Sequence, residues 1–250
     1  MDYSKYCSLT YNNKLLDSLV PGYTTINVEG RGLLNRSLTT VDIPGRSGQR
    51  VTNRQINSRN IRVHFLLKAE RSQEFMQRLH LLHEYLESEE DVVFQFGDES
   101  YFRWGQVSEM EDPPYDQLQG VGTFTIFCQD PYKYDQQQQL EGNPTTLISD
   151  TSAPIHPDLI EVIFRSSTDK LIVSNLGNGR RIIINDSFSA SDIVKIKIKE
   201  GKIEKNLTNI MNKLDYAETD WNEFVIRNKD KIQVTPINCN MKITYRRKFL

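Results

Sequence analysis

Apolar and polar side chains alternate along short stretches of the first 130 residues. Within residues 59–67, Ile61, Val63 and Phe65 fall on one side of an extended chain, and Arg62 and His64 fall on the other. This period of two is typical of a strand with one buried face. The same alternation predicts strands over residues 24–28, 92–96, 101–107 and 121–128, with residues 97–100 as a hairpin turn.

One stretch has the period of a helix instead. Phe75, Leu79, Leu82 and Leu86 recur three or four residues apart, which places them on one stripe of a helix over residues 72–87. Ser72 is a residue type that commonly caps a helix N-terminus. Because charged residues lie opposite the stripe, we predict a single amphipathic helix that packs on a sheet.

The second half of the chain has short apolar runs at regular intervals. They predict strands over residues 159–164, 171–174, 181–185, 193–199, 202–205, 223–226, 231–234 and 241–245. Residues 177–179 and 200–201 have the composition of hairpin turns, and residues 208–214 could form a helical turn. Short strands at even spacing favour a β-sandwich.

A break in the pattern separates the two halves. Asp130, Pro131 and Tyr132 form the predicted domain junction, and four glutamines follow at 136–139. Proline cannot donate to a strand ladder, and the glutamines have no apolar face to bury. We therefore predict a mainly β chain with two domains. Residues 1–134 would form a β-sandwich with one α-helix, residues 135–157 a linker with one edge strand near 147–148, and residues 158–250 a second β-sandwich whose last residues could pack back on the first domain.

Charge is divided unevenly between the halves. Residues 1–139 contain 14 basic and 19 acidic residues, and residues 140–250 contain 17 and 14, within a chain of net charge −2. No overall positive field therefore indicates nucleic-acid binding. The chain lacks an apolar run of membrane-spanning length, and its first residues lack a signal-peptide pattern. We expect no membrane association and a protein made in a cytoplasm.

Candidate chemical sites are weak throughout. Cys7, Cys128 and Cys239 are odd in number and far apart, so we expect free thiols rather than disulfides or a zinc site. His80 and His83 are three residues apart on the predicted helix, which is not the spacing of a zincin motif. No nucleophile elbow or phosphate-binding loop occurs. We therefore expect no catalytic, cofactor or metal site.

The most informative anomaly is a cluster of arginines. Seven arginines fall within residues 31–62, where Asp42 is the only acidic residue: Arg31, Arg36, Arg46, Arg50, Arg54, Arg59 and Arg62. The polar, weakly periodic sequence predicts a long loop or an extended hairpin arm. Guanidinium groups suit carboxylates at a subunit interface, and the first six of these arginines are our candidate inter-subunit arm. A solvated loop and a nucleic-acid contact are the alternatives.

Trp221 is a further candidate, because β-sandwiches often bind sugars through an exposed tryptophan. A lone tryptophan is more commonly a packing residue. Whether Trp221 binds a glycan is left open at this point.

Several segments resemble the distal tail protein family of siphophages and related prophages. They are PGRSG at residues 44–48, SRNIRV at 58–63 with the amphipathic helix after it, FCQDPYKY at 127–134, and the final KFL at 248–250. Their order and spacing cover nearly the whole chain. The resemblance implies a tail-tube-like sandwich with a helix as the first domain and a galectin-like sandwich as the second.

The resemblance also implies a structural role in the virion. Six copies would form a ring that continues the tube of the major tail tube protein, docks the tail tip protein and could pair with a second ring. The second domain would hold baseplate or receptor-binding components, and DNA would pass the lumen unread. Residues 158–250 lack a galectin-type sugar-binding motif, so sugar binding does not carry over. A carbohydrate-binding tail module and another tail tube component are the alternatives.

Overall fold

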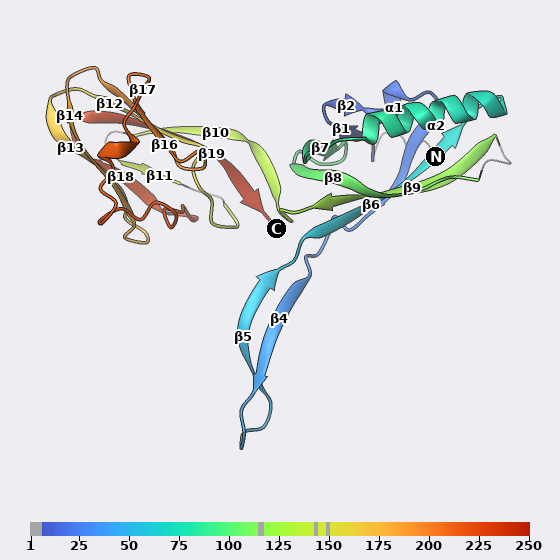
Figure 1. Ribbon diagram of the computed structural model, residues 1–250, viewed down its shortest axis with the longest axis horizontal. Coiled ribbons are helices and arrows are strands. Elements are labelled where there is room, and N and C mark those ends of the chain that lie inside the picture. Colours follow the sequence, from blue (N-terminus) through green and yellow to red (C-terminus); the bar gives the residue numbers. More distant parts are fainter. Residues whose placement is uncertain (1–6, 115–117, 143–144, 149–150) are drawn as a thin grey trace. The chain divides into compact units, whose positions relative to one another are not determined.

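The computed structural model describes residues 7–114, 118–142, 145–148 and 151–250, and these divide into two compact units that meet in sequence at residues 133 and 134. Within these described residues, the first unit has nine strands and two helices (Figure 1). They are β1 (Leu9–Tyr11), β2 (Lys14–Leu15), α1 (Leu16–Leu19), β3 (Tyr23–Glu29), β4 (Arg36–Asp42), β5 (Gln49–Ile56), β6 (Arg59–Lys68), α2 (Ser72–Leu86), β7 (Val92–Phe96), β8 (Phe102–Glu111) and β9 (Gln119–Cys128).

The core of the first unit lies between its sheet strands and α2. β6 pairs with β9 along its whole length and with β3 on its other side. β8 pairs first with β7 and then, towards its end, with β9, so that one strand belongs to two sheets. The inward side chains of β6 and β9 are buried with the apolar stripe of α2, which contributes Phe75, Leu82 and Leu86.

The predicted strands of this unit are confirmed, and the helix start is corrected. The strand expected over residues 92–96 has the observed bounds. The other four extend by one to four residues at one or both ends, and the strand expected to start at residue 101 begins one residue later. Arg71, not Ser72, is the N-cap of α2, and it makes no side-chain capping bond. Glu74 takes part of that role, since its carboxylate accepts a hydrogen bond from the Glu70 amide at 3.0 Å. The sequence pattern did not predict the short α1.

The second unit is a β-sandwich. One sheet has the order β17-β16-β15-β12-β19-β10 and the other has the order β11-β18-β13-β14. Its elements are β10 (Lys133–Gly142), β11 (Thr145–Leu147), β12 (Leu159–Phe164), β13 (Thr168–Asn175), β14 (Arg181–Phe188), β15 (Ile193–Lys197), β16 (Lys202–Lys205), β17 (Thr208–Asn209), the 3-10 turn η2 (Met211–Lys213), β18 (Lys231–Thr235) and β19 (Cys239–Phe249).

The core of this sandwich explains most of the predicted strands. Ile160, Val162 and Phe164 of β12 are buried against apolar side chains of the facing sheet, including Val173 of β13 and Ile184 of β14. The alternation of these residues made the strands predictable, and the fold class of two β-rich units is confirmed. The strand expected over residues 223–226 is absent from this described stretch, where only Ile226 forms an isolated bridge, to Ile155.

The segment expected to be a linker differs from that expectation. Residues 133–142, which include the four glutamines, form β10 beside β19, and residues 145–147 form β11. Asp135 also accepts a hydrogen bond from Arg247 Nε of β19 at 2.9 Å. Backbone pairing with a neighbouring strand needs no apolar side chain, which is why composition alone concealed this strand.

Candidate functional site

A two-stranded hairpin stands apart from the sheets of the first unit. β4 and β5 pair in antiparallel register, and neither pairs with another strand of the described chain (Figure 1). Every side chain of β4 is exposed, as is every side chain of β5 except Ile56. We call residues 36–56 the arm. A hairpin with no core beneath it is marginally stable in water, so a partner surface would stabilise it.

Four of the seven clustered arginines lie on the arm. Arg36 is on β4, Arg50 and Arg54 are on β5, and Arg46 is in the connecting loop, whose turns use positive φ at Gly45 and Gly48. None of the four guanidinium groups forms an ion pair with a carboxylate of the described residues. With Asp42 as the only acidic residue, the arm has a net charge of +3.

Arg31 and Arg59 were predicted to belong to the arm, but the structure places both outside it. Arg31 donates from Nη1 and Nη2 to the two carboxylate oxygens of Asp98, at 2.5 and 2.8 Å, and lies over the ring of Phe96. This hydrogen bonding holds the pKa of Asp98 below its usual value. Arg31 therefore ties the segment before the arm to the hairpin turn between β7 and β8.

Arg59 has a structural role at the base of the arm. Its side chain is buried, and its guanidinium donates to the carbonyl oxygens of Arg31 and Gly32, at 2.7 and 3.4 Å. Burial, together with the positive charge of Arg103, lowers the pKa of Arg59. Gly30 beside it has φ +83°, and an added Cβ would lie 2.1 Å from the Asn60 carbonyl oxygen. The arm thus leaves the unit from a rigid base.

The sequence pattern also missed exposed apolar side chains on the arm. Leu38, Val41 and Val51 are 56%, 50% and 37% exposed. Register places Leu38 beside Arg54, Thr40 beside Val51 and Val41 beside Arg50, with a bulge between Asn53 and Val51. That bulge breaks the alternation of β5, which is why the sequence looked weakly periodic. Arginine is enriched at protein interfaces, and the core of an interface is apolar, so these arginines and aliphatic side chains together suit a protein-binding surface.

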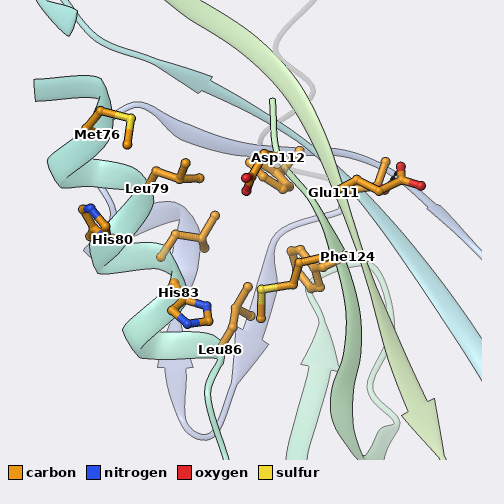
Figure 2. A pocket seen from close by; sticks show the side chains of 12 residues that line it. Met76, Leu79, His80, His83, Leu86, Glu111, Asp112 and Phe124 are labelled. Atoms are coloured by element: carbon orange, nitrogen blue, oxygen red, sulfur yellow. Dashed lines mark hydrogen bonds between the residues drawn. The ribbon is translucent and has the colours of Figure 1, made fainter. Parts of the chain in front are cut away.

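A pocket of about 310 Å³ lies between α2 and strands β6, β8 and β9. We call it the α2 pocket. Its lining includes Met76, Leu79 and His83 of α2, Met110 of β8, Asp112 after β8 and Phe124 of β9. Figure 2 shows the Asp112 carboxylate directed towards the pocket and the Glu111 side chain directed away from it. Glu111 instead accepts a hydrogen bond from Arg62 at 2.7 Å.

Other candidate residues do not assemble into a chemical site. No group of three or more His, Cys, Asp and Glu in the described part of the chain is arranged to hold a metal ion, His80 and His83 included. Burial raises the pKa of the Cys128 thiol to about 12, so it is protonated at neutral pH. Trp221 is partly buried and packs against the core of the second unit.

Comparison with known proteins gives two family matches that together span most of the chain. Residues 5–127 match the phage tail protein RIFT-related domain, and residues 150–249 match the C-terminal domain of the siphovirus-type tail component. The solved structure of the Dit protein of phage SPP1 has a TM-score of 0.80 at 19% identity, covering 98% of this chain and 100% of that chain. The chain belongs to the siphophage distal tail protein family.

The SPP1 Dit protein is described as a paradigm of the hub of the adsorption apparatus in phages that infect Gram-positive bacteria. Two structures of the phage P2 baseplate in its activated conformation, one with Ca and one with Sr, have TM-scores of 0.49 and 0.48 at 11% identity, each covering 92% of both chains. No curated protein gave a significant match.

Within this distal tail protein, the predicted junction residues lie between the two matched segments. Asp130 accepts a hydrogen bond from the Tyr132 amide at 3.1 Å, an Asx turn that ends the extended run of β9. β10 begins at Lys133. No helix in the described ranges is both long and apolar enough to cross a membrane. As a phage tail component, the protein is a structural part of the virion.

Proposed function

We propose that this distal tail protein is a ring-forming hub. Six copies would close into a ring, with the arm of each copy contacting the next. The ring would continue the tail tube on one side and dock the tail tip protein on the other. The likeness in fold to the SPP1 hub protein supports this proposal.

The arm is the observation that supports the proposal most directly. It presents four arginines and three aliphatic side chains to solvent, on a hairpin that pairs with no other described strand. The remainder of residues 1–139 is strongly acidic, so a second copy offers the carboxylates that the arm lacks. A contact between two different surfaces of identical chains generates a ring when the rotation between neighbours closes.

The outer face of the sheet is suited to a channel that passes DNA without binding it. Arg62 pairs with Glu111 at 2.7 Å, and His64 lies 3.2 Å from Glu29, so basic groups on this face have acidic neighbours. Retention of DNA depends on cations that replace its counterions. A face with neutralised arginines provides few of them. This face would therefore line the lumen in the proposed ring.

The second unit would anchor other baseplate or receptor-binding components outside the tube. Its match to the C-terminal domain of siphovirus-type tail components supports a role within the tail. A pull-down with the purified tail tip protein and receptor-binding protein of the same phage would test this part separately. Binding that survives deletion of residues 151–250 would refute it.

The oligomeric state tests the central proposal. Mass photometry and negative-stain electron microscopy of the purified chain, alone at high concentration and with its tail tip partner, should show closed six-fold rings that stop at one or two layers. Long tubes would identify a tail tube component instead. A monomer under every one of these conditions would refute the ring.

A further inference from the structure

The arm has two unlike faces. Side chains of an extended strand alternate, so Leu38 and Val41 of β4 point to opposite sides. On β4, the Leu38 face also carries Arg36, Thr40 and, nearest the loop, Asp42. On β5, their partners on the same face are, in register, Arg54 opposite Leu38, Ile56 opposite Arg36, Val51 opposite Thr40 and Gln49 opposite Asp42. The opposite face pairs Val41 with Arg50 and otherwise presents Ser37, Gln55, Thr39 and Asn53. Around Leu38, the first face is therefore an apolar row flanked by two guanidinium groups.

The α2 pocket has the complementary character. Its floor is formed by core side chains, including Leu82 and Phe124, and its edge by the longer, partly exposed Met76 and Met110. Methionine side chains adapt readily to an incoming apolar group. The Asp112 carboxylate lies at the same edge (Figure 2). An aliphatic side chain flanked by arginine fits this combination of apolar floor and acidic edge.

The distribution of charge along the chain also supports docking of the arm in the α2 pocket. Residues 79–132, which include most of α2 and all of β7, β8 and β9, contain 12 acidic residues and a single basic one, Arg103. Arg103 is buried and paired with Glu99. Arg31 and Arg62, from outside this segment, pair with Asp98 and Glu111, so the negative charge at the surface comes from the other acidic residues. The arm has a net charge of +3. Opposite potentials on two surfaces guide them together and set their register.

We infer that the Leu38 face of the arm of one copy docks in the α2 pocket of the next copy. This inference rests on the proposed ring and specifies which two surfaces close it. Leu38 enters the pocket between Met76 and Met110, and the guanidinium of Arg54 lies towards Asp112. Because arm and pocket are different surfaces of the same chain, each copy uses its arm on one neighbour and its pocket on the other.

Disulfide trapping tests the contact directly. In the full-length chain with Cys7→Ser, the double variant Leu38→Cys with Met110→Cys should form disulfides between copies, giving a ladder of up to six chains on non-reducing gels. Cys128 and Cys239 are buried and stay in place. The matched control joins Val41→Cys, on the opposite face of the arm, to the same Met110→Cys. It should give no ladder above background.

A second pair of variants avoids any covalent bond. Leu38→Asp would bury a carboxylate in an apolar pocket and should raise the concentration for half-maximal ring assembly by at least about tenfold. Val41→Asp introduces the same charge at a similarly exposed site and should change it by no more than about threefold. Rings that form without a disulfide between the cysteines introduced at positions 38 and 110, or that tolerate Leu38→Asp as well as Val41→Asp, would overturn the docking inference and leave the ring intact. Absence of rings in the unmodified chain would instead overturn the proposed function, and the docking inference with it.

Discussion

Charge reversal on the arm is the sharpest general test of ring formation. Replacing Arg46, Arg50 and Arg54 with glutamate changes the arm from a net charge of +3 to −3. Each reversal removes an attraction of about 0.5 kcal/mol and adds a repulsion of similar size at a partly exposed contact. The three together should weaken each interface by about 3 kcal/mol, which is a loss in affinity of about 100-fold.

The assay is mass photometry across a dilution series, with circular dichroism and thermal unfolding as checks on the fold. The three arginines are exposed and form no ion pair with a described carboxylate, so the unfolding free energy should change by no more than about 0.5 kcal/mol per substitution. Rings of the unmodified chain should also become less stable as salt rises from about 0.05 to about 0.5 M. Added salt shortens the distance over which exposed charges attract one another, which is about 10 Å at about 0.1 M.

A matched control separates the arm from net charge. Lys170, Lys213 and Lys231 are exposed residues of the second unit, and replacing all three with glutamate brings the whole chain to the same net charge of −8. This variant should assemble as the unmodified chain does. If the arm variant assembles normally, the arm is not the interface. If both variants fail equally, overall repulsion is responsible and the reasoning about the arm is wrong.

Three further predictions concern the fold that supports the arm. Glu99→Ala would leave the buried Arg103 without its carboxylate and should lower the unfolding free energy by about 3 kcal/mol in chemical denaturation, whereas Arg103→Met should cost far less. Because the pKa of Asp98 is lower in the folded state, its stabilising effect is present at neutral pH and is lost as pH falls through that lowered pKa. Asp98→Asn should therefore reduce the fall in unfolding free energy as the pH is lowered from neutral to acidic. An unchanged fall would show that the Asp98–Arg31 pair does not contribute to it. Ellman's reagent should label Cys7 alone in the native protein and three thiols after denaturation; faster labelling of a second thiol would contradict the burial.

Local patterning was enough to find most of the elements. β6 and β12 have apolar residues at every second position, and α2 has them at helical spacing. Each pattern reflects one buried face of the element, so the order of apolar residues in the sequence is enough to predict it. The arginine cluster likewise indicated an extended arm without knowledge of the fold. These features depend on residues within a few positions of one another, so a single sequence contains the necessary information.

Other features depended on partners that are distant in sequence. β10 is a strand because β19, about a hundred residues later, supplies its backbone hydrogen bonds, and the glutamine run gives no sign of this. Arg31 and Arg59 look like Arg50 and Arg54 in the sequence. Only the fold brings Asp98 to the first and the carbonyl oxygens of residues 31 and 32 to the second.

The sequence by itself therefore determined most of the strands, the long helix and the existence of a basic segment suited to an arm, because each follows from local spacing or composition. Tertiary structure alone decided which arginines stay exposed on that arm, which face of it is apolar, and where an apolar pocket with an acidic edge lies. Those properties arise when strand pairing and burial bring together groups that are far apart along the chain, and no local pattern records such pairing.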